Sequence, residues 1–121
     1  MLYNYYMHEL AIAEALIEQV GTELDRAGQS GAVKRLELAV GRLSGVHCDS
    51  LRFAFGLLSP GTPAEGAELS IRQPPAISRC RQCAAATEIT EIVLDCPQCG
   101  SPEIVIEEGR ELLLESIEIE D

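Results

Sequence analysis

The first forty residues change from a helical to an alternating spacing of hydrophobic positions. Over residues 9–28 apolar side chains recur at three- and four-residue steps, which predicts a helix with one apolar face. That face comprises Leu10, Ala13, Leu16, Ile17, Val20 and Leu24. Gly28 can end the helix in the left-handed conformation that glycine tolerates. Residues 33–43 then alternate, with Leu36, Leu38 and Val40 on one face, which predicts a half-buried strand.

Further elements follow along the chain. Asp49 or Ser50 can cap a second helix near residues 50–58. Leu69 and Ile71 alternate with polar residues in a strand that prolines terminate, and residues 110–119 form another apolar stretch that can pair with the earlier strands. This order predicts an α+β fold, with two helices on a three-stranded sheet and a zinc-ribbon-like domain beside it.

Four of the five cysteines form two close pairs. Cys80 and Cys83 are followed, after twelve residues, by Cys96 and Cys99. Two such C-x2-C turns supply four thiolates in a tetrahedron, which is the closed coordination of structural zinc. The pattern favours Zn(II) over two disulfides or an iron site of the rubredoxin type. A site with no open position for water is not expected to be hydrolytic.

The segment around these cysteines is too short to bury a core of its own. Metal binding would supply its folding free energy, on the order of 10 kcal/mol. The Ile- and Val-containing run 87–94 is predicted to form the hairpin of this module. We therefore expect a zinc-binding domain over residues 76–105, inserted in a domain built from residues 7–75 and 106–121.

The charge distribution narrows the choice of partners. The net charge is −11, and residues 67–121 carry 12 acidic and 4 basic side chains. Such a chain lacks a surface that neutralises phosphates, which argues against nucleic acid as a partner. We see neither an apolar run long enough for a membrane helix nor a secretory leader, so we expect a cytoplasmic protein without membrane association.

Several short motifs resemble the HypA/HybF family of hydrogenase maturation factors. They are Met7-His8-Glu9-Leu10-Ala11-Ile12-Ala13-Glu14, Gly41-Arg42-Leu43-Ser44-Gly45-Val46, Leu51-Arg52-Phe53-Ala54-Phe55, the paired cysteines, and Gly109-Arg110-Glu111-Leu112 followed by Glu115-Ser116-Ile117. The likeness covers nearly the whole chain from Met7 onward. It implies a nickel metallochaperone for [NiFe]-hydrogenase, with Ni(II) as transported cargo and Zn(II) as structural metal.

The resemblance also implies residue roles. Zinc would be held by Cys80, Cys83, Cys96 and Cys99. Nickel would be bound at the amino terminus by His8, together with the terminal amine of Met7 and the backbone nitrogens of His8 and Glu9. Four nitrogens in fused chelate rings impose a square plane, which d8 nickel accepts and zinc does not favour. The domain of residues 7–75 and 106–121 would then be the nickel-binding domain.

Residues 1–6 precede the usual start of that family. They contain all three tyrosines of the chain, a break in composition that suggests an extension outside the fold. If they are retained, the nitrogen of Met7 is an amide and the terminal-amine ligand is lost. From spacing alone, His8 before a helix reads as a surface or capping residue rather than a ligand.

Other functions are weaker. His47 and Cys48 could form an accessory metal contact, but an ordinary loop is the simpler interpretation. No acid–base or nucleophile constellation supports an enzyme, and no phosphate-cradling glycine loop occurs, so nucleotide hydrolysis would belong to a partner. The implied partners are a HypB-like maturation GTPase and the hydrogenase large subunit. The alternative function is a zinc-ribbon adaptor that does not deliver nickel. The sequence leaves open whether the protein forms a homodimer and whether it also delivers nickel to another enzyme such as urease.

Overall fold

The computed structural model describes the backbone of residues 2–120 and the side chains of residues 8–120. Contacts divide the chain into two compact units, which are described separately. Unit 1 contains residues 1–38, 46–71 and 114–121, and unit 2 contains residues 39–45 and 72–113. Among the described residues, no helix has the length and apolar character needed to cross a bilayer.

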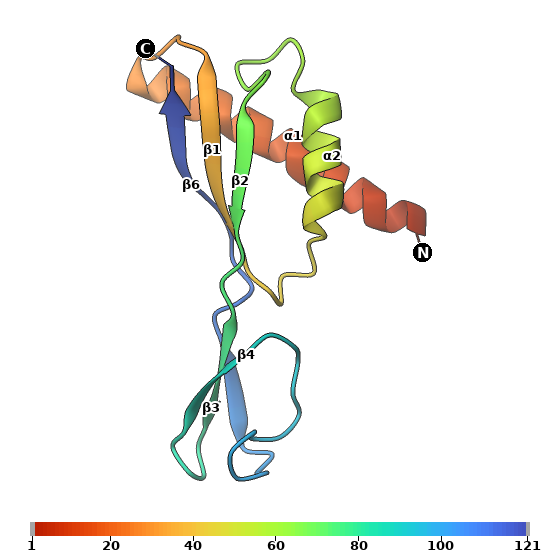
Figure 1. Ribbon diagram of the computed structural model, residues 1–121, viewed down its shortest axis with the longest axis vertical. Coiled ribbons are helices and arrows are strands. Elements are labelled where there is room, and N and C mark those ends of the chain that lie inside the picture. The colour runs from red at the N-terminus through yellow and green to blue at the C-terminus, as the bar shows by residue number, and fades with distance from the viewer. Residues whose placement is uncertain (1, 121) are drawn as a thin grey trace. The chain divides into compact units, whose positions relative to one another are not determined.

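Unit 1 begins with helix α1, Leu2–Ala27 (Figure 1). The predicted helix is confirmed, but it begins seven residues earlier than expected. Neither glycine nor proline occurs between Leu2 and Glu9, so nothing in the sequence ends the helical backbone there. Of the predicted extension, Met1 and the side chains of residues 2–6 lie outside the described structure, while the backbone of residues 2–6 continues α1.

Helix α2, Cys48–Leu58, packs against α1. It buries Leu51, Ala54 and Phe55, whereas Phe53 is 68% exposed. The predicted cap was wrong: the N-cap is His47, whose Nδ1 accepts a hydrogen bond from the backbone N of Ser50 at 3.2 Å. A ring nitrogen here replaces the side-chain oxygen that caps most helices.

The sheet of unit 1 has the strand order β2-β1-β6. Its strands are β1, Val33–Val40; β2, Glu68–Arg72; and β6, Leu112–Ile119. The backbone N of Glu120 donates to Ala32 O at 3.0 Å, so the end of β6 lies beside the start of β1 and these strands run antiparallel. The two helices on a three-stranded sheet are confirmed, with Leu36 and Leu38 among the buried residues of β1.

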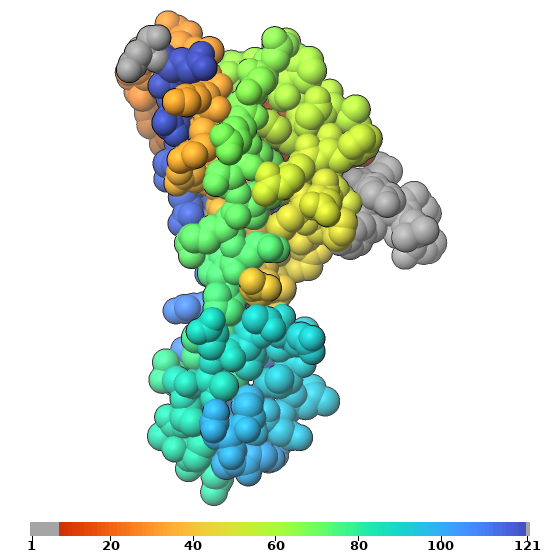
Figure 2. Space-filling model, viewed as in Figure 1, coloured from red at the N-terminus to blue at the C-terminus, as the bar shows by residue number. Residues whose placement is uncertain are grey.

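Unit 2 contains an antiparallel sheet of order β4-β3-β5. Its strands are β3, Ala76–Cys80; β4, Ala86–Ile89; and β5, Ile104–Glu107. The hairpin expected within 87–94 was wrong, because β4 pairs back with β3 and residues 90–95 contain no strand. In the space-filling view the teal and light-blue atoms of this sheet and its cysteine loops form one body (Figure 2).

Residues 39–45 form backbone hydrogen bonds with two other segments of unit 2. Gly41 N donates to Glu111 O at 2.8 Å, Arg42 N to Pro74 O at 3.0 Å, and Leu43 N to Gly109 O at 2.7 Å. Gly109 has a φ of 79°, and a Cβ on it would lie 2.6 to 2.8 Å from atoms of Ala76. This junction therefore requires a residue without a side chain.

Replacing Gly109 by alanine should lower the free energy of unfolding of unit 2 by at least about 2 kcal/mol, since left-handed strain and steric overlap add. Gly45→Ala is the matched control. Gly45 has a φ of 80°, but a Cβ added to it would meet no atom within 4 Å, so only the conformational strain applies. Hydrogen exchange of the unit 2 amides measures both variants, and equal losses would contradict steric crowding at the junction.

Candidate metal centre

Two tight turns bring the four paired cysteines together. Cys80 ends β3 and Cys83 lies in the turn before β4, while Cys96 and Cys99 lie in the turn that precedes β5. In each turn the first sulfur accepts two backbone N–H groups. Cys80 Sγ accepts from Gln82 N at 3.3 Å and Cys83 N at 3.4 Å. Cys96 Sγ accepts from Gln98 N and Cys99 N at the same two distances.

The sulfur positions fit a tetrahedral zinc ion. All four Sγ atoms lie within 4.8 Å of one another, and the Cys80–Cys99 and Cys83–Cys96 pairs are both separated by 3.7 Å. A tetrahedron with Zn–S bonds of about 2.3 Å has sulfur–sulfur edges of about 3.8 Å. No disulfide joins these residues, so the alternative of two disulfides is not what the structure contains. Within the part of the chain that the structure describes, this is the one cluster with metal-ligand geometry.

The electrostatics of the four thiols also favour binding of a cation. The N–H of Cys99, followed by that of Gln98, lowers the pKa of Cys96 to about 7, and the N–H of Cys83 is the main cause of the lowered pKa of Cys80. A backbone hydrogen bond with Ser101 lowers the pKa of Cys99, but burial and the neighbouring thiols outweigh it and raise this pKa to about 12. Four adjacent thiolates repel one another, so a divalent cation is what allows all of them to ionise.

His8 lies near the start of the described side chains, on α1 in unit 1. Its side chain is 57% exposed, and its Nδ1 lies 3.0 Å from Oε1 of Glu9. The Glu9 carboxylate is fully buried, and its Oε2 has no hydrogen-bond partner. The side chain of Met7 lies outside the described residues.

Glu9 was expected from the sequence only as a backbone ligand, and the burial of its side chain was missed. The signal was present in the helical spacing. Positions 9, 13, 16, 20 and 24 repeat at four- and three-residue steps, and these residues form the buried stripe of α1: Glu9, Ala13, Leu16, Val20 and Leu24. Leu10, which was assigned to the apolar face, is only half-buried. The first position of the buried stripe is therefore a carboxylate beside the imidazole of His8.

His47 and Cys48 do not join the metal-ligand cluster. The Nδ1 atom of His47 is occupied by the cap of α2, where it lies 2.7 Å from Oγ of Ser50. Burial, partly opposed by Arg52, raises the pKa of the Cys48 thiol. A thiol with a raised pKa is a poorer metal ligand and nucleophile, which argues against an accessory metal contact. The two residues form the start of α2 rather than the expected loop.

Comparisons with known proteins agree with this architecture. Residues 7–119 match the family model described as "Hydrogenase/urease nickel incorporation, metallochaperone, hypA". A hydrogenase maturation factor HypA of Chlorobaculum tepidum is 43% identical over 116 residues, which cover 94% of this chain and 100% of the relative. A HypA of Streptomyces avermitilis is 40% identical, with 95% of this chain and 88% of the relative covered.

The fold is also found among solved structures. The solution structure of the Ni metallochaperone HypA from Helicobacter pylori superposes with a TM-score of 0.64 at 20% identity, covering 92% of this chain and 96% of that one. The four-cysteine site and the two-helix α+β unit define a two-unit metal-binding protein. The chain belongs to the HypA family of nickel-incorporation metallochaperones, and its four cysteines fit the structural zinc site expected from the sequence.

Proposed function

We propose that this protein delivers Ni(II) during the maturation of [NiFe]-hydrogenase and that it holds Zn(II) as a structural ion rather than as cargo. The family match from Met7 to Ile119 carries this proposal. The geometry of the cysteine cluster supports a structural role for zinc and a cargo role for nickel. The cysteine cluster has no fifth ligand position, so an ion held there is retained rather than exchanged.

The nickel site is assigned to His8 with the backbone nitrogens of Met7, His8 and Glu9. In the 121-residue chain these nitrogens lie inside α1, which begins at Leu2, and helix hydrogen bonds occupy interior amides. The first four N–H groups of a helix have no intrahelical partner. A chain that starts at Met7 places its amine and the amides of His8 and Glu9 among those four groups, where nickel can replace their protons.

The zinc ligands are assigned to Cys80, Cys83, Cys96 and Cys99, all in unit 2. We propose that residues 76–105 form the zinc-binding domain and that residues 7–75 and 106–121 form the nickel-binding domain. The zinc-binding segment contributes few buried apolar side chains, among them Ala76 and Ile89. Its fold should therefore depend on the metal.

The proposed partners supply the functions for which this chain has no sequence motif. The sequence contains no glycine-rich phosphate loop, so we assign GTP hydrolysis to a HypB-like maturation GTPase and nickel acceptance to the hydrogenase large subunit. This assignment makes the protein a cytoplasmic carrier rather than an enzyme. The charge of −11 suits binding of a cation and of basic protein surfaces.

Nickel titration of two zinc-loaded proteins tests the proposal. The chain starting at Met7 should bind one Ni(II) with the absorption spectrum of a square-planar nitrogen site, and acidification should release it because protons compete for amine and imidazole. The 121-residue chain should bind more weakly or with another spectrum, since its Met7 nitrogen is an amide. Weak, non-stoichiometric binding in both proteins would favour a zinc-ribbon adaptor instead.

A further inference from the structure

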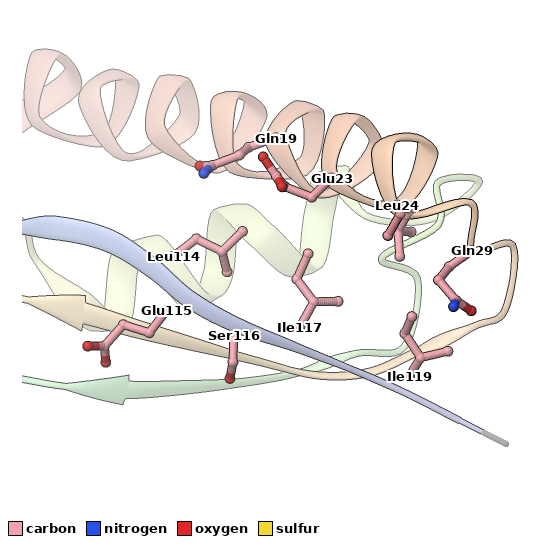
Figure 3. A pocket seen from close by; sticks show the side chains of 10 residues that line it. Gln19, Glu23, Leu24, Gln29, Leu114, Glu115, Ser116, Ile117 and Ile119 are labelled. Carbon is pink, nitrogen blue, oxygen red and sulfur yellow. The ribbon is translucent and has the colours of Figure 1, made fainter.

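The exposed cysteines of this chain both belong to the zinc centre. Cys83 and Cys99 are exposed, Cys48 is half-buried, and Cys80 and Cys96 are buried. The groove that α1 and β6 form in unit 1 is lined by amide, carboxylate, hydroxyl and apolar side chains, with no cysteine or histidine among its described lining residues (Figure 3). Because thiolates are the strongest nucleophiles among protein side chains, an electrophile is expected to react at the zinc centre.

The four sulfurs of the centre differ in the hydrogen bonds that their turns provide. Cys80 Sγ and Cys96 Sγ each accept two backbone N–H groups, at 3.3 and 3.4 Å. Cys99 has a backbone hydrogen bond with Ser101. Within the part of the chain that the structure describes, no backbone N–H donates to Cys83 Sγ. Each N–H···S bond withdraws electron density from a thiolate and makes it less nucleophilic, so Cys83 has the most nucleophilic sulfur of the four.

A second sulfur lies close to Cys83 Sγ. It is Cys96 Sγ, which belongs to the other turn of the centre and is 3.7 Å away. Bonded sulfurs of a disulfide are about 2.0 Å apart, so this pair has to close by less than about 2 Å. Cys96 is buried, so an electrophile reaches it less easily than it reaches the exposed Cys83. The two residues thus have the arrangement of a reactive thiol and a resolving thiol.

We propose that Cys83 is the site at which hydroperoxides modify this protein and that Cys96 resolves the modified sulfur as a disulfide. With hydrogen peroxide, the Cys83 thiolate attacks one oxygen, so that an S–O bond forms while the O–O bond breaks and hydroxide leaves. The Cys96 thiolate then attacks the sulfur of this sulfenic acid, which forms the S–S bond and releases a second hydroxide. Solvent protons convert both hydroxides to water. The two thiolates lose two electrons, and one peroxide gains them.

This disulfide removes two of the four zinc ligands. The proposal therefore rests on the assignment of Zn(II) to the four cysteines. The remaining thiolates, Cys80 and Cys99, provide two ligands where structural zinc requires four, so unit 2 loses the metal on which its fold depends. Sulfenic acids and disulfides are reduced by thiols, so a dithiol together with zinc restores the centre. The exposed Cys83 makes unit 2 sensitive to peroxide in a reversible way.

The test uses the unchanged 121-residue protein, because replacing Cys83 would itself remove a zinc ligand. The zinc content is measured first, which checks the four-cysteine assignment independently. Hydrogen peroxide is then added, and a chromogenic chelator records the zinc that is released. One zinc ion should appear for each disulfide formed, and a dithiol with added zinc should return the metal to the protein.

Mass spectrometry identifies the sulfurs that react first. Trypsin and the protease Glu-C cut after Arg81 and Glu88, which places Cys80, Cys83 and Cys96 on separate peptides. At low conversion the Cys83–Cys96 disulfide should exceed every other pairing at least about fivefold, since Cys83 combines exposure with the most nucleophilic sulfur. Dimedone, which traps sulfenic acids, should label Cys83 before any other zinc ligand.

Cys48→Ser is the matched control, because it removes a thiol that lies outside the cluster. This variant should release zinc at a rate within about twofold of the parent protein and form the same first disulfide. Zinc retained after prolonged treatment with millimolar peroxide, first oxidation at another zinc ligand, a different first pairing, or release that requires Cys48 would each overturn the proposal. Absence of zinc before treatment would contradict the four-cysteine assignment and this proposal with it.

Discussion

Replacing His8 by alanine in a protein that starts at Met7 is expected to weaken nickel binding by more than about a hundredfold, while the zinc content stays at one ion per chain. In the proposed nickel site the imidazole anchors a plane whose other ligands include backbone amides. These amides are too weakly acidic to hold nickel at neutral pH without that anchor. Calorimetric titration with Ni(II), together with metal analysis of the same samples, measures both quantities.

The contact between His8 and Glu9 means that this substitution also affects stability. His8 Nδ1 lies 3.0 Å from Oε1 of the fully buried Glu9 carboxylate, so alanine removes a contact of a group that already has one unpartnered oxygen. An unsatisfied buried acceptor costs about 1–3 kcal/mol. His8→Gln is therefore the sharper variant, because its amide can still donate to Glu9 but cannot replace imidazole in the nickel plane. It should lose nickel as completely as His8→Ala with a smaller change in melting temperature.

The matched control concerns the other histidine. His47→Asn removes an imidazole but keeps a residue that caps helices well, so α2 should remain folded. Its nickel affinity should equal that of the parent protein. If His8→Gln retained stoichiometric nickel, or if His47→Asn lost it, the amino-terminal assignment would be wrong and the site would have to be sought around α2 or the cysteines.

Replacing Cys96 by serine is expected to abolish stoichiometric zinc and to unfold unit 2 while α1 and α2 remain helical. Serine can still accept the N–H groups of Gln98 and Cys99 but supplies no thiolate. Zinc contributes on the order of 10 kcal/mol to folding in sites of this kind. The core of unit 1 contains its own buried residues, such as Leu36 and Leu51, so it should not depend on the metal.

Hydrogen exchange and far-ultraviolet circular dichroism distinguish local from global unfolding in this variant. Amides of β3, β4 and β5 should lose protection, whereas the helical dichroism should change little. Cys48→Ser is the control and should keep one zinc per chain, because Cys48 lies outside the cluster. Complete loss of helical signal in Cys96→Ser would show that the two units do not fold separately, and retention of zinc would contradict the four-cysteine assignment.

Most helices and strands could be predicted because the sequence features that form them are local. The apolar spacing of α1, the alternation of β1 and the prolines after β2 act over a few residues. These elements occur where expected, except that α1 begins seven residues earlier. The paired cysteines could be recognised for the same reason: two residues between thiols are enough to aim both at one ion. Their spacing predicted a cluster, and the structure places all four sulfurs within 4.8 Å of one another.

The features that could not be predicted depend on packing between segments distant in the sequence. The burial of Glu9 and the exposure of Phe53 are set by which helix face meets the rest of unit 1, and local spacing allows more than one choice. Strand β4 pairs with β3 rather than with a following strand. This pairing could not be predicted, because the register between two strands depends on contacts that neither segment shows alone. Local spacing thus predicted most of the elements and the four-cysteine cluster. The buried carboxylate beside His8 and the pairing of β6 with β1 rather than with β2 arise only when the folded chain brings its separate segments into contact.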